Sequence, residues 1–165
     1  MALVRIGPAG LCALTNAAVS PNREVKLAFV TALLGQFKMR GVTFPAHDEE
    51  LALVGAVHLP FLINLLHDRI PEIRALAAEV LGAVHEKPEL VVPELERLLN
   101  DPELFARSVG ADALGEYGTE AKSAVPGLVE HIKQAKGASE KETTIKALQE
   151  IDAEAAAQFV QTNSY

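Results

Sequence analysis

Histidine is the side chain of this sequence that most readily binds metal ions or transfers protons near neutral pH. Its five copies are His47, His58, His67, His85 and His131. No two of them have the His-Glu-x-x-His spacing that places two metal ligands and a general base on one helical face. The sequence also lacks a phosphate-binding glycine loop, a nucleophile elbow and a Cys-x-x-Cys pair. Cys12 is the single cysteine, and such a residue usually fills core space. These patterns predict no catalytic, metal or cofactor site.

Aspartate and arginine form a second set of chemically active residues, and they recur. Asp68 and Arg74 are followed 33 residues later by Asp101 and Arg107. An aspartate at a helix start can accept hydrogen bonds from free backbone N–H groups, and arginine can bridge neighbouring turns through charge-assisted bonds. Pro102 suits a first helical position. Because the pairs recur, we interpret them as a structural ladder rather than as functional groups.

The same period runs through the whole second half of the sequence. Pro60, Pro93 and Pro126 stand 33 residues apart. The matched columns include Leu65-Leu66 with Leu98-Leu99, Arg74 with Arg107, Ala78 with Ala111, and Leu81-Gly82 with Leu114-Gly115. A third copy starts at Val125-Pro126, gains one residue in the turn 134–137, and has Lys141 in the arginine column. A period of this length is typical of stacked supersecondary units.

Each unit is predicted to contain two helices. In the second helix of one unit, apolar residues recur at steps of three and four from Ile73 to Val84, which is one helical stripe. A lone helix pair cannot bury both of its faces, so neighbouring pairs must stack. Small residues such as Gly82 and Gly115 allow close stacking. Ser139 and Glu142 have the spacing of a capping box. Each first helix is expected to begin just before its proline or to bend there.

Composition agrees with a single helical domain over residues 1–165. Of the 165 residues, 49% are hydrophobic but only 5% are aromatic, with no tryptophan, so the core must be aliphatic. The predicted units cover about 7–36, 48–86, 88–118 and 119–157, with a loop at 38–47 and a frayed tail at 161–165. The opening residues lack the apolar run of a signal peptide, and no stretch has the roughly 18 apolar residues of a membrane span. We therefore expect a cytoplasmic chain that does not enter a membrane.

Charge limits the partners. The net charge of −7 comes from 22 acidic against 15 basic residues. Nucleic-acid binding depends on clustered Lys and Arg that displace counterions, and this chain has no basic run. The sequence therefore predicts a protein partner with a basic surface and no nucleic acid.

The repeated pattern resembles the HEAT-like repeats, in the short form found in phycobilin lyases. The matching elements are Leu65-Leu66-His67-Asp68, Ile73-Arg74 and Ala78-Glu79-Val80-Leu81-Gly82, and the next copy repeats them from Leu98 to Gly115. The resemblance covers roughly residues 7–36 and 55–157. It implies an all-α, right-handed α-solenoid of antiparallel helix pairs whose second helices line a concave face. Such folds usually serve as scaffolds that bind other macromolecules.

Enzymes of similar fold provide tests of that expectation. Deoxyhypusine hydroxylase binds iron through His-Glu pairs that follow the arginine of the second helix, where this chain has Ala75-Leu76 and Ser108-Val109; His85-Glu86 lies beyond the glycine. HEAT-like DNA glycosylases use tryptophans and a basic cleft, and this sequence has neither. Bilin lyases share the fold, but no residue here indicates a tetrapyrrole pocket. We therefore expect no catalysis and no cofactor.

The third copy departs from the pattern. Gln134 replaces the aspartate and Gln149 the glycine, as expected of a terminal cap. The opening Ile6-Gly7-Pro8 resembles a junction between repeats, so we hypothesise that the chain is a piece of a longer repeat protein.

The remaining candidates for function lie on the surface of the second helices. The predicted partner-binding row is Thr31, Glu79, Asp112 and Lys146, flanked by Glu72, Phe105, Ser108 and Glu116. Phe105 stands in the column of Glu72, so it is either an exposed aromatic anchor or packs under the neighbouring unit. We predict a non-catalytic protein-interaction scaffold. The alternatives are an accessory or lyase-like factor that handles a cofactor, and a structural spacer.

Overall fold

The computed structural model describes residues 22, 24–25 and 59–163, and apart from Asn22 it shows helices joined by short turns. Residues 59–65 are helical. They are followed by α4 (Pro71–Val84), α5 (Pro88–Leu98), α6 (Leu104–Glu116), a 3₁₀ helix η1 (Gly118–Ala124), α7 (Val125–Gln134), α8 (Ala138–Ile151) and α9 (Ala153–Asn163). No strand occurs within these residues. The predicted all-α class is confirmed.

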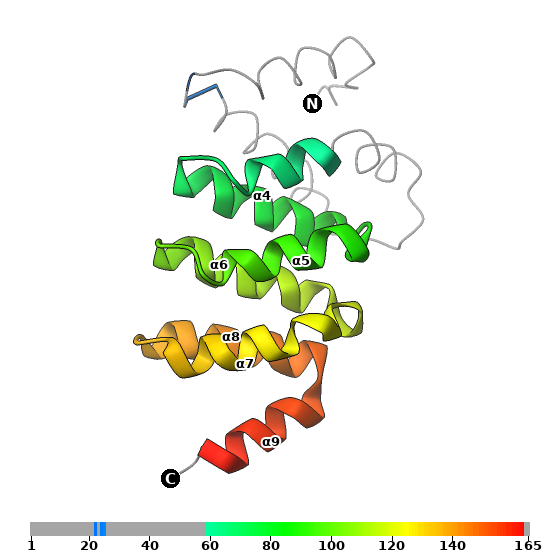
Figure 1. Cartoon of the computed structure of the whole chain (residues 1–165), viewed down its shortest axis with the longest axis vertical. Helices are drawn as coiled ribbons and strands as arrows, with labels where there is room; N and C mark the ends of the chain where they lie inside the picture. The colour runs from blue at the N-terminus through cyan, green and yellow to red at the C-terminus, as the bar shows by residue number, and fades with distance from the viewer. Residues whose placement is uncertain (1–21, 23, 26–58, 164–165) are drawn as a thin grey trace, which may run out of the picture.

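The helices are arranged as a stack of pairs (Figure 1). The second helices α4, α6 and α8 pack on one another in order, while α5 packs on α6 and α7 packs on α8. Leu81, Leu114 and Leu148, the equivalent leucines of these three second helices, are all fully buried. Repetition of one buried position in successive pairs is the organisation of an α-solenoid. Within residues 59–163, no helix is both long and apolar enough to cross a membrane.

Glycines let the second helices approach closely, as the sequence predicted. A Cβ atom built on Gly82 of α4 would lie 3.1 Å from the Cα of Ala113 in α6, and one on Gly115 would lie 3.1 Å from the Cα of Ala147 in α8. Nearly any side chain at these two positions would push the helix backbones apart. The Leu-Gly columns therefore set the spacing between units.

The starts of the second helices differ from the prediction. The Oδ1 atom of Asp101 accepts a hydrogen bond from the Glu103 N–H (2.9 Å), but α6 begins only at Leu104, so Pro102 lies before the helix. The capping box at Ser139 is wrong, because α8 begins at Ala138 after Gly137 and has no side-chain cap. The inserted residue in the turn 134–137 moves this helix start ahead of Ser139. Asp101 thus closes a local turn instead of capping the helix.

The column prolines behave in two ways. Pro126 is the second residue of α7, as expected, because its missing N–H falls where no helical partner exists. Pro93 lies inside α5, which begins five residues earlier at Pro88. Pro93 is exposed, so water can satisfy the carbonyl that its missing N–H leaves unpaired.

A further helix, α9, follows α8 after the single residue Asp152. The Oδ1 atom of Asp152 accepts hydrogen bonds from the N–H groups of Glu154 (3.2 Å) and Ala155 (3.1 Å), which fixes the start of α9. The helix continues through Asn163, so it includes the first part of the segment 161–165 that was expected to fray. Ala156 and the half-buried Phe159 attach α9 to the core, which gives these residues a packing partner.

Tyr117, at the end of α6, holds the turn between α4 and α5. Its hydroxyl donates to the carbonyl oxygens of Leu81 and Glu86, both at 3.0 Å, and its ring stacks on His85 with a centroid distance of 4.6 Å. His85 and Lys87 have positive φ angles of 52° and 48°, which is strained for residues other than glycine. Burial is the main reason that the pKa of Tyr117 is raised.

Replacing Tyr117 by phenylalanine should lower the free energy of unfolding by about 1–3 kcal/mol, because two buried carbonyls lose their donor while the ring packing stays. Urea denaturation followed by circular dichroism measures this loss. A free energy of unfolding equal to that of the wild type would show that the tyrosine hydroxyl does not hold the turn.

Candidate functional site

The outward side of the second helices carries the predicted binding row. On α6, Phe105, Ser108, Asp112 and Glu116 follow one another at helical spacing, and all four are at least partly exposed. Glu79 of α4 and Glu150 of α8 lie on either side of Glu116, close enough to raise its pKa. We call this surface, consisting of Glu79, Phe105, Ser108, Asp112, Glu116, Lys146 and Glu150, the acidic face.

The electrostatics of the acidic face are unfavourable for its carboxylates. Burial raises the pKa of Asp112; the charge of Lys146 lowers it and that of Glu150 raises it further. Burial also raises the pKa of Glu116, with added repulsion from Asp112, Glu79 and Glu150 and a smaller attraction from His85. Both shifts mean that ionisation of these groups opposes folding at neutral pH. A cation placed between them would relieve that repulsion.

Glycines position two of these glutamates. A Cβ atom on Gly82 would collide with the carboxylate of Glu116, and one on Gly115 would collide with that of Glu150. Each glutamate therefore lies against the glycine of the preceding second helix. Glu150 was missed in the sequence, although it stands 34 residues after Glu116 and follows from the alignment of the third copy.

The other predicted site residues are placed as follows. Phe105 is 60% exposed, which decides between the two alternatives for this side chain. Glu72 is exposed at the start of α4, and Glu79 and Ser108 are half-buried. Lys146 is exposed and its Nζ lies 3.6 Å from Oε1 of Glu150. Thr31 lies outside the described residues.

The aspartates and arginines form a ladder between units, not within them. Arg74 donates from Nε and Nη2 to both carboxylate oxygens of Asp101 in the next unit, at 2.6 and 2.7 Å, and from Nη1 to the Asp68 carbonyl at 2.7 Å. This bond to Asp101 raises the pKa of Arg74. Burial by itself would raise the pKa of Asp101, but the bonds from Arg74 and the Glu103 N–H lower it overall. The pair is structural, as predicted.

Glu140 completes the ladder at the third copy. The Nε atom of Arg107 donates to Oε1 of Glu140 at 2.5 Å, and its Nη1 donates to the Asp101 carbonyl at 2.8 Å. The Glu140 side chain is only 4% exposed. Column matching had placed Gln134 in the aspartate column and therefore missed this acid, which the first turn of α8 supplies instead.

The described histidines lie beside single glutamates. The Nε2 atom of His85 lies 2.6 Å from Oε2 of Glu120, and that of His67 lies 3.0 Å from Oε2 of Glu94. His85 thus pairs with a residue of η1, not with its neighbour Glu86. No three metal-binding side chains come together within the residues that the structure describes.

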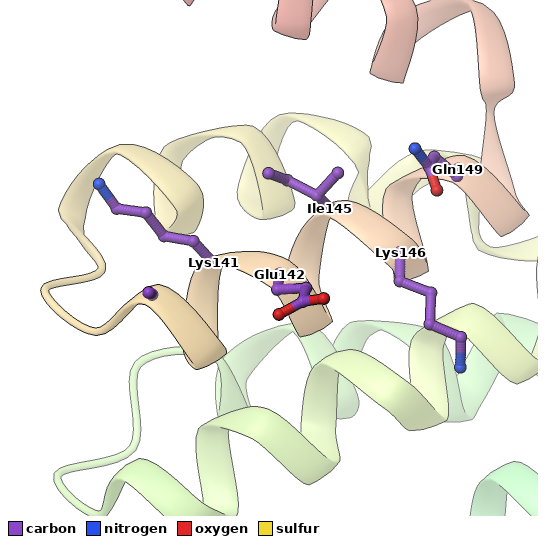
Figure 2. A pocket seen from close by; sticks show the side chains of 6 residues that line it. Lys141, Glu142, Ile145, Lys146 and Gln149 are labelled. Carbon is purple, nitrogen blue, oxygen red and sulfur yellow. The ribbon is translucent and has the colours of Figure 1, made fainter.

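One open hollow of about 560 Å³ lies along α8 (Figure 2). Its lining comes from that single helix, namely Ala138, Lys141, Glu142, Ile145, Lys146 and Gln149. In the figure the charged ends of Lys141, Glu142 and Lys146 extend outward instead of converging on one point. A cofactor site usually encloses its ligand within apolar walls that carry a few convergent polar groups, and this hollow has neither feature.

Comparison with known families agrees with the stacked geometry. A family model described as HEAT repeats matches residues 59–149, which include every column quoted above from Leu65 to Gly115. No curated protein matches the sequence. HEAT repeats commonly mediate protein–protein interactions, and the family is generally non-catalytic. Because the match spans more than half of the chain, this chain belongs to the family of HEAT repeat proteins.

Proposed function

We propose that this chain is a non-catalytic interaction module whose acidic face binds a protein with a basic surface. The observation that carries the proposal is the exposed ring of Phe105, which lies on the same helical stripe as Asp112 and Glu116. A large exposed aromatic side chain is a common anchor of protein interfaces. Leu104, 51% exposed beside it, adds apolar area at the same helix start.

Charge supports the choice of partner. Asp112 and Glu116 make no hydrogen bond or ion pair with another described residue, and the neighbouring carboxylates raise the pKa of both. A Lys or Arg side chain of a partner would relieve this repulsion while its apolar neighbour covers Phe105. Such complementarity mainly raises the association rate, so binding should weaken as salt concentration rises.

Substitution on this face should abolish binding without unfolding the protein. We expect the double variant Asp112→Lys with Phe105→Ala to lose a partner that the wild type recovers from a cell lysate, with at least a tenfold lower yield. The matched control is Leu90→Ala, because Leu90 is 53% exposed but lies on α5. Quantitative mass spectrometry of the recovered proteins provides the measurement.

Folding is checked separately. Since the charged form of Asp112 opposes folding, a lysine there should not lower the urea midpoint of unfolding. A partner recovered equally by the double variant and the wild type would contradict the proposed face. Recovery of no protein above the level of bare beads would contradict the proposed function itself.

A further inference from the structure

His131 of α7 lies buried at the seam between the pair α5–α6 and the pair α7–α8. Its side chain is 7% exposed, and its Nε2 atom lies 3.4 Å from Oε1 of Glu140. Within the described residues, Nε2 is the one buried side-chain nitrogen or oxygen without a hydrogen-bond partner. The ring also hydrogen-bonds the backbone of Leu99 at the end of α5. The imidazole therefore contacts groups from both helix pairs.

The charges around this ring are already paired. Glu140 of α8 accepts a hydrogen bond from Arg107 of α6 at 2.5 Å through the same oxygen that faces His131. A protonated imidazole would be a second cation beside one carboxylate, in a seam from which water is excluded. Burial is the largest influence on His131; Glu140 attracts a proton and Arg107 repels it, and the net result is a pKa below the usual 6.5.

We propose that His131 makes this seam sensitive to protons, so that proton uptake by its imidazole loosens the packing of α7–α8 against α5–α6. The neutral ring fits the closed seam, whereas the imidazolium is better solvated once the helix pairs separate. Arg107, Glu140 and the Leu99 backbone are the groups that face the ring from the neighbouring elements. The inference concerns the end of the stack and does not depend on the proposed partner.

The direction of the pH effect follows from the linkage between protonation and opening. Because the closed seam lowers the pKa of His131, the opened state binds more protons, and closure weakens as the pH falls below about 6.5. Each unit of difference between the pKa values of the closed and opened states changes their population ratio by about tenfold. The stabilisation is fully present above the usual pKa and is lost below the pKa of the closed state.

The titration of the ring itself is the first test. Proton NMR of the imidazole Cε1–H groups across the acid range should show His131 titrating at a lower pH than His67. His67 is a matched reference, because it also lies beside a glutamate but its side chain is 44% exposed. An equal or higher titration point for His131 would overturn the proposal, because the Glu140 attraction would then outweigh burial.

Amide hydrogen exchange tests the structural consequence. The protection of α8 relative to α4 should fall between about pH 7.5 and about pH 5.5, since changes in intrinsic exchange cancel in this ratio. His131→Leu should remove the fall, and His67→Gln should keep it. His131→Gln, which is polar but does not titrate, serves as well if the leucine variant fails to fold. An equal fall in the wild type and in either His131 variant would overturn the proposal.

Discussion

Replacement of Arg74 by methionine should lower the free energy of unfolding by about 3 kcal/mol. The substitution leaves the Asp101 carboxylate, 6% exposed, without the cation that binds both of its oxygens. It also removes the donor to the Asp68 carbonyl. Breaking a buried pair on one side costs more than the pair itself contributes, because an uncompensated charge stays behind. Urea denaturation of the wild type and the variant measures the loss.

Two further variants separate the ion pair from the size of the side chain. Arg97→Met removes an arginine whose pair with Glu94 is 68% exposed and 3.4 Å long, and its effect should stay below about 0.5 kcal/mol. Arg74→Met combined with Asp101→Asn should be less destabilising than the sum of the two single changes, because no buried carboxylate is stranded. Equal losses for Arg74→Met and Arg97→Met would rule out an energetically important ladder.

Leu114→Ala should be similarly destabilising, at about 3 kcal/mol. Leu114 is fully buried in α6, between α4 and α8, which both pack on that helix. Truncation removes apolar contacts and leaves a cavity that the tightly spaced helix backbones cannot close. Thermal and urea unfolding, each followed by two probes, would measure the change and show whether the stack unfolds in one step.

The matched control lies on the same helix. Leu104 is 51% exposed, so Leu104→Ala should change the free energy of unfolding by less than about 0.5 kcal/mol. A cost for Leu114→Ala as small as that for Leu104→Ala would mean that the leucine column does not form the core of the stack.

Features that repeat were predictable. The 33-residue columns place Leu81 and Leu114 at equivalent buried positions, and Gly82 and Gly115 at equivalent close contacts. Such contacts join residues at a fixed register, because one geometry is used again in each unit. Periodicity therefore suffices to predict them. The stripe with Phe105, Asp112 and Glu116 follows from the same helical spacing.

Features at the insertion and at the end of the stack depended on tertiary structure. The extra residue in the turn 134–137 alters where α8 starts, so Glu140 reaches Arg107 although it does not occupy the aspartate column. Likewise α9 is stabilised by packing on α8 rather than by a column of its own. The exposure of Phe105 and the burial of His131 also depend on which neighbours the folded chain brings near.

The sequence by itself thus determined the helical repeat, the family and the acidic stripe, because each is written in regularly spaced residues. Only the tertiary structure decided which acid binds which arginine and how the last unit is attached. These outcomes depend on the path of the backbone through one irregular turn, and no spacing along the chain records that path.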